Sequence, residues 1–131
     1  MSPYVTPNKK LTFGGCIMIA DNNEHNDYFK DILGNFADDS GLDYGMCEML
    51  IKMYITEAEV LIYKIDSALN IGSYKDAIRL IHNLKGTSAN IRATEIASIA
   101  LLAEQALRQN KIEEVRKLIV ELFSLLEKFT K

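Results

Sequence analysis

Apolar residues recur at helical spacing along the chain from about residue 24 onward. In the first such segment, from Glu24 to Phe36, the Tyr, Phe, Ile and Leu residues lie four positions apart, so they share one face of a helix. Asn22 or Asn23 can cap the start of this helix, and the polar run at 38–41 ends it. The pattern therefore predicts a short amphipathic helix whose aromatic side chains lie in the core.

A much longer helix is predicted from Asp43, a favourable N-cap residue, to about Asn70. Its expected inward stripe consists of Leu50, Met53, Tyr54, Leu61, Ile65 and Leu69. Three of the five methionines, at positions 46, 49 and 53, fall within this helix. We expect them to fill the core rather than to form an adaptable partner surface, because methionines at helical spacing are more often core residues.

Three more amphipathic helices are predicted after a break at Gly72-Ser73. The first covers about 74–91, and the second begins at Thr94, which can serve as its N-cap. The last begins with Asn110 and Glu113, the spacing of a capping box, and its apolar stripe continues to residue 129. Four long helices joined by short turns pack most simply as an antiparallel up-down bundle, with the short helix across one end. The predicted fold is therefore all-α.

The first twenty residues follow a different pattern. Residues 1–10 contain two prolines and two adjacent lysines, a composition typical of a tail. Leu11 to Ala20 is either a short strand or an extended lead-in that packs on the domain, and its periodicity does not choose between these. This apolar run is too short to span a bilayer, so we expect a cytoplasmic protein. The expected division is a lead-in at 1–20 and a helical domain at 21–131.

Composition excludes several classes of function. With 131 residues and 48% hydrophobic residues, the chain can form one core, and its net charge of -3 does not favour nucleic acid or anionic membranes. Cys16 and Cys47 are far apart and belong to no Cys/His cluster, which argues against a zinc site, a redox motif or a disulfide framework. We therefore expect no metal, no cofactor and, by default, a monomer.

His82 stands out on the helix predicted at 74–91. The core face of this helix is expected to hold Ala77, Leu80, Ile81, Leu84, Ser88 and Ile91. On the helical wheel, His82 lies about 150° from the centre of that face, so its ring should point to solvent. An exposed histidine alone is usually an ordinary surface residue.

The neighbours of His82 make a functional interpretation stronger. Gly86 lies opposite the core, where glycine costs about 1 kcal/mol relative to alanine and helix packing gives no reason for it. Together with Ile78 and Ala89, it leaves His82 among small residues, which favours a docking face. Arg79 can belong to this face, although its charge is more typical of a solubilising surface residue than of a specific contact. Lys85 is three positions after His82, within reach of an anion attached to the ring.

These residues suit the acceptance of a phosphoryl group. A neutral imidazole is nucleophilic near pH 7, and phosphoryl transfer depends mainly on positioning and charge neutralisation. His82 would attack an acyl phosphate held by a partner, and Lys85 and the partner's Mg²⁺ would share the charge.

The segment His82-Asn83-Leu84-Lys85-Gly86 and the small residues after it resemble the HxLKG motif of histidine phosphotransfer domains of phosphorelays, and the resemblance extends over about residues 40–128. It implies that His82 is phosphorylated, that Lys85 faces the phosphate and that Gly86 provides clearance. It also implies receiver domains of response regulators and hybrid sensor kinases as partners. The family usually has glycine where this chain has Arg92, so the turn there is expected to differ and to affect partner choice more than phosphoryl acceptance.

Three other functions stay open at this stage. A helical adaptor could keep the docking face and bind receiver or kinase partners without being phosphorylated. The phosphoacceptor domain of a chemotaxis-type kinase would share the chemistry, but its motif is expected nearer the start and further domains after it. An independent enzyme is least favoured, because the sequence has no Walker-type loop, nucleophile elbow or HExxH motif.

Overall fold

The computed structural model describes residues 27–130, and within them the chain forms α-helices and one short 3-10 helix. The elements are α2 (Asp27–Ser40), α3 (Tyr44–Asn70), α4 (Tyr74–Asn90), α5 (Thr94–Arg108), α6 (Ile112–Glu127) and η3 (Lys128–Thr130). Several predictions concern residues outside this range: the caps Asn22 and Asn23, the helix start at Glu24, Cys16 and the lead-in at 1–20.

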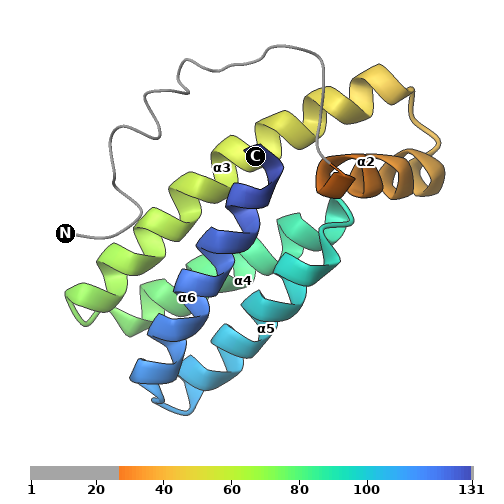
Figure 1. Cartoon of the computed structure of the whole chain (residues 1–131). Coiled ribbons are helices and arrows are strands. Elements are labelled where there is room, and N and C mark those ends of the chain that lie inside the picture. The colour runs from red at the N-terminus through yellow and green to blue at the C-terminus, as the bar shows by residue number, and fades with distance from the viewer. Residues whose placement is uncertain (1–26, 131) are drawn as a thin grey trace.

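The four long helices, α3 to α6, form an antiparallel up-down bundle, which confirms the predicted fold class (Figure 1). α4 packs between α3 and α5, and α6 packs against α5 and α3, so the ring of helices is closed. The shorter α2 lies at the end of the bundle where α3 begins, and it contacts α3 and η3 (Figure 1). Its residues Phe29 and Phe36 are buried, as the pattern predicts.

The buried stripe of α3 differs from the predicted one. It consists of Cys47, Ile51, Tyr54, Ala58, Ile62, Ile65, Ala68 and Leu69. Leu50 and Leu61 are only partly buried, and Met53 is 54% exposed, so the placement of Met53 in the core was wrong. Met46 and Met49 are exposed as well. The pattern was ambiguous because α3 carries apolar residues on two opposite faces, and only packing decides which face is buried.

The three turns between the long helices share one backbone geometry. Each contains one residue with positive φ, namely Gly72 at 77°, Arg92 at 73° and Asn110 at 60°. The N–H of the next residue donates to a carbonyl five positions back, at 2.8 to 2.9 Å, which closes the preceding helix in a Schellman-type motif. The turn at Arg92 therefore has the same backbone geometry as the other two, including the one with glycine at position 72.

This geometry also corrects two predicted helix caps. Thr94 is the first residue of α5 rather than its cap, and Asn110 occupies the left-handed position that ends α5. Asparagine tolerates that conformation better than most residues do. The N-cap residues are Ala93 and Lys111, and neither makes a side-chain cap hydrogen bond. The predicted cap at Asp43 is confirmed, since its carboxylate accepts from the N–H of Met46 at 3.2 Å.

Arg92 compensates for its strained backbone with side-chain contacts. Its guanidinium donates through Nη1 to the carbonyl oxygens of Ala89 and Asn90, at 3.1 and 3.0 Å, near the C-terminus of α4. Its Nε donates to Asp39 Oδ2 at 2.7 Å. Because Asp39 belongs to α2, this ion pair fastens the short helix to the turn between α4 and α5.

Candidate functional site

His82 lies near the middle of α4, on the side away from the core. The buried residues of this helix are Ala77, Ile81, Leu84 and Ser88, and Leu80 is only partly buried. Ser88 Oγ and Tyr54 Oη form a buried hydrogen bond of 2.7 Å that fixes α4 against α3. The His82 side chain is 65% exposed, in agreement with the helical wheel. The packing of α4 therefore presents the imidazole to solvent.

The surface beside His82 is open. A Cβ atom built on Gly86 would meet no atom within 4 Å, so nothing fills the space that this glycine leaves. Ala89 is exposed and Ile78 is partly buried. Arg79 is exposed and pairs with Asp76 of the same helix at 3.3 Å. Four residues of the predicted docking face thus lie on the exposed side of α4, and Arg79 already has a local partner.

Glu104 is the site residue that the sequence analysis missed. It belongs to α5, and its side chain is only 7% exposed. Its Oε2 lies 3.2 Å from His82 Nδ1 and accepts from Arg108 Nη2 at 2.9 Å, while its Oε1 accepts from Lys85 Nζ at 3.0 Å. One buried carboxylate therefore joins the imidazole to two cations and ties α4 to α5.

The surroundings of Glu104 keep it ionised. Burial raises the pKa of this carboxyl, but hydrogen bonds from Arg108, Lys85 and His82 and the charge of Lys85 lower it, to about 2 in the balance. A carboxylate can only accept hydrogen bonds. The contact with His82 therefore requires a proton on Nδ1 at neutral pH.

With the proton on Nδ1, the other ring nitrogen, Nε2, is available for chemistry. In a neutral imidazole with the proton on Nδ1, the lone pair lies on Nε2. A carboxylate behind the ring also stabilises positive charge that develops on it when Nε2 attacks an electrophile, as in other His–carboxylate pairs. The arrangement can therefore supply an oriented, exposed nitrogen nucleophile.

Lys85 pairs with a residue that the sequence did not single out. Its ammonium, which is predicted to reach an anion attached to His82, donates to Glu104 in the structure, and its side chain is 29% exposed. The buried carboxylate attracts it because an uncompensated charge there would be costly. An ammonium has three donors, so the bond to Glu104 leaves two for another anion.

Leu101 is an exposed apolar residue of α5 that the sequence did not single out. It lies three positions before Glu104 on α5, which places it one turn away on the same side of that helix, and it is 41% exposed.

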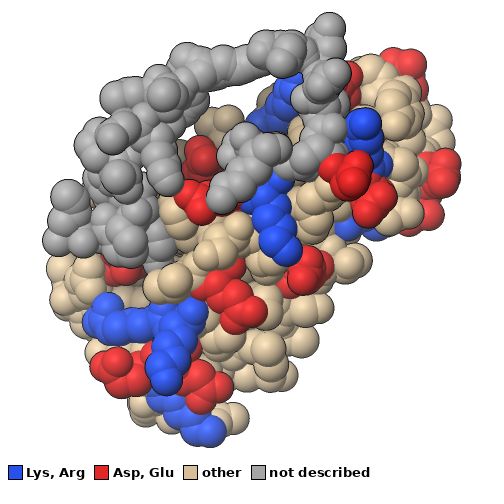
Figure 2. Space-filling model, in the orientation of Figure 1, with Lys and Arg blue, Asp and Glu red and all other residues tan. Residues whose placement is uncertain are grey.

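On the face of the molecule seen in Figure 2, Lys and Arg side chains lie among Asp and Glu side chains and form no separate basic patch.

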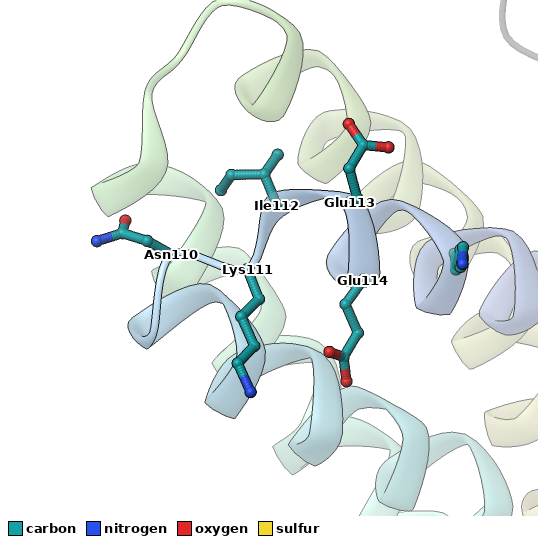
Figure 3. A pocket seen from close by; sticks show the side chains of 6 residues that line it. Asn110, Lys111, Ile112, Glu113 and Glu114 are labelled. Carbon is teal, nitrogen blue, oxygen red and sulfur yellow. The ribbon is translucent and has the colours of Figure 1, made fainter.

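Other features do not add a site. Figure 3 shows an open hollow at the start of α6, lined by Asn110, Lys111, Ile112, Glu113, Glu114 and Lys117, none of which belongs to α4. Within residues 27–130, no group of three or more His, Cys, Asp or Glu side chains could hold a metal ion. In the same part of the chain, no helix is long and apolar enough to cross a membrane.

An up-down bundle with an exposed histidine on one helix and a carboxylate of the next helix against that histidine is an arrangement that fits a helical phosphotransfer module. The profile of the Hpt domain family matches residues 49–129, more than half of the chain, and the protein belongs to this family. Comparisons with curated proteins and with solved structures find no significant match. Family membership establishes the general activity, histidine phosphotransfer in phosphorelays, with receiver domains as the general class of partner.

Proposed function

We propose that this protein accepts a phosphoryl group on Nε2 of His82 from the phosphorylated aspartate of one receiver domain and passes it to another. The observation that carries the proposal is the contact between His82 Nδ1 and Glu104, at 3.2 Å, beneath a ring that is 65% exposed. It orders the imidazole while leaving Nε2 accessible to a partner. The protein then acts as a phosphocarrier without a nucleotide site of its own.

In the proposed step, the Nε2 lone pair forms a bond to phosphorus while the bond to the partner's aspartate oxygen breaks. Nε2 carries the lone pair and no proton, so no proton has to be removed before it attacks. The aspartate leaves as a carboxylate. The ring gains positive charge, which the Glu104 carboxylate offsets through the Nδ1 proton. Because that proton stays on Nδ1, the imidazole remains a good leaving group, and the step can reverse onto a second receiver domain.

Lys85 and Gly86 have supporting roles in this proposal. The two free donors of the Lys85 ammonium can reach oxygens of a phosphoryl group on the neighbouring turn. The partner supplies Mg²⁺ for the remaining charge. Gly86 leaves space for the rim of the partner's acidic pocket, since nothing lies within 4 Å of its missing side chain. Ile78, Arg79, Ala89 and the newly found Leu101 would surround this contact.

The test is transfer of labelled phosphate from a phosphorylated receiver domain to the purified chain. We expect label that is acid-labile and resistant to hydroxylamine, and a ³¹P NMR signal of phosphohistidine substituted at Nε2. His82→Gln should abolish the label, whereas Asn83→Gln, at the adjacent exposed position, is a matched control that should retain it. Undiminished labelling of His82→Gln would refute the assignment.

Two further outcomes distinguish the alternatives. If receiver domains bind the chain but never label it, the protein is an adaptor that keeps only the docking face. If label appears at Nδ1 rather than Nε2, the role given to Glu104 is wrong, even though His82 remains the acceptor.

A further inference from the structure

A row of exposed apolar side chains runs along α3. Of the eleven large apolar side chains that are exposed within residues 27–130, seven lie between Leu42 and Tyr63. Five of these, spaced for one outward face of α3, form what we call the α3 stripe: Met46, Met49, Met53, Val60 and Tyr63, each 43% to 54% exposed. The stripe lies opposite the buried face of the same helix and is interrupted between Met53 and Val60 by the exposed Thr56 and Glu57. Exposed apolar side chains gathered on one face often mark a contact with another surface.

The size of the α3 stripe favours a short segment over a second copy of the chain. Five half-exposed side chains offer on the order of 400 Å² of apolar surface. A stable protein interface needs about 800 Å² from each partner. A segment tethered to the same chain needs less area, because its effective concentration is about millimolar.

The described chain begins close to α3. The Tyr28 ring lies 4.8 Å from that of Phe129, which in turn lies 6.3 Å from that of Tyr54 in the middle of α3. Residues 21–26 are all polar and, fully extended, span up to about 20 Å. This exceeds the helix diameter of about 10 Å, so residues 11–20 can reach the outward face of α3.

The segment 11–20 has the matching pattern. In an extended chain, alternate residues share one face, and here that face carries Leu11, Phe13, Ile17 and Ile19. From residue 11 to residue 19 an extended chain spans about 26 Å, and from Met46 to Tyr63 a helix also spans about 26 Å. We propose that residues 11–20 dock in extended form along the α3 stripe, with these four side chains against the methionines, Val60 and Tyr63.

Oxidation of the stripe methionines by dilute hydrogen peroxide, followed by peptide mass spectrometry, tests this proposal on the full chain. Phe13→Asp/Ile17→Asp places two charges on the proposed docking face, and Thr12→Asp/Cys16→Asp places the same charges on the opposite face. We expect Met46, Met49 and Met53 to be oxidised at least about threefold faster in the first variant than in wild type and the second variant. A threefold change corresponds to a segment that is docked about two-thirds of the time.

Removal of residues 1–20 gives an independent measurement, and it should expose the same methionines without loss of the far-UV circular dichroism of the helices. Equal oxidation rates in wild type and all variants would overturn the proposal. Protection that increases with protein concentration would also overturn it, because the occupant would then be a second copy.

Discussion

Glu104 should stabilise the fold in a way that depends on pH. Its ordinary pKa of 4.5 falls to about 2 in the folded protein, a difference that corresponds to about 3 kcal/mol of unfolding free energy. Lys85 and Arg108 are 29% and 58% exposed, so water screens part of this interaction. We therefore expect Glu104→Gln to lower the free energy of unfolding by about 2 kcal/mol at pH 7.

The sign of the pH dependence follows from the lowered pKa. The folded protein holds the Glu104 proton less tightly than the unfolded chain does, so the stabilisation is complete above the unfolded value of 4.5. It is lost as the pH falls toward about 2. The stability difference between wild type and Glu104→Gln should therefore shrink across this range. Urea unfolding followed by circular dichroism at a series of pH values measures that difference.

Asp76 provides the matched control for this experiment. Its carboxylate also accepts two side-chain hydrogen bonds, from Ser73 and Arg79, but it is exposed to solvent. Asp76→Asn should leave the stability at neutral pH nearly unchanged. If Glu104→Gln instead lowers stability equally at every pH, its effect comes from packing, and the electrostatic reasoning about the site is refuted.

Three further predictions test the turn, the core and the open surface. Arg92→Ala should be about 1 kcal/mol less stable than Arg92→Gly in urea unfolding, because both variants lose the guanidinium contacts but only alanine keeps the strain of the left-handed backbone; equal stabilities would contradict this. Tyr54→Phe and Ser88→Ala should each cost about 1 to 2 kcal/mol, and the double variant less than their sum, as a double-mutant cycle can measure; full additivity would show that the 2.7 Å bond contributes little. Gly86→Ala should increase the free energy of unfolding by up to about 1 kcal/mol, seen as a higher melting temperature, yet slow phosphoryl transfer. Unchanged transfer would contradict the clearance role.

The sequence predicts the architecture well because helix periodicity and turn residues are local signals. Helix lengths and breaks follow directly from the apolar spacing, and the bundle follows from four long helices with short connections. The caps at Thr94 and Asn110 were each misplaced by one residue. A residue such as asparagine suits both an N-cap and a left-handed helix end, and sequence alone does not distinguish these two uses.

The site was predicted only in part because its carboxylate, Glu104, comes from another helix. His82, Lys85 and Gly86 lie in one short motif, whereas Glu104 lies 22 positions further on. A signal was present: Glu104 is a charged residue directly after the buried Ala103, near the apolar stripe of α5. A carboxylate at the edge of a core face needs a cation from its neighbour, and α4 carries Lys75, Arg79 and Lys85 against Asp76 alone. That inference required knowing which helices are adjacent, which periodicity does not give.

Dividing the site between two helices explains how one imidazole can be both ordered and accessible. A ring held by partners on its own helix would gain no constraint from the packing of the bundle, and a ring placed in the core would be closed to a partner protein. Here the ring is 65% exposed while the carboxylate behind it is 7% exposed. The hydrogen bond between them therefore holds an exposed ring against a side chain that the core keeps in place. The direction of Nε2 therefore depends on the packing of α4 against α5. That packing is fixed partly by the turn at Arg92, whose geometry matches that of the glycine turn at Gly72. The turn at Arg92 thus keeps the left-handed geometry of a glycine turn while Glu104 lies 3.2 Å from His82.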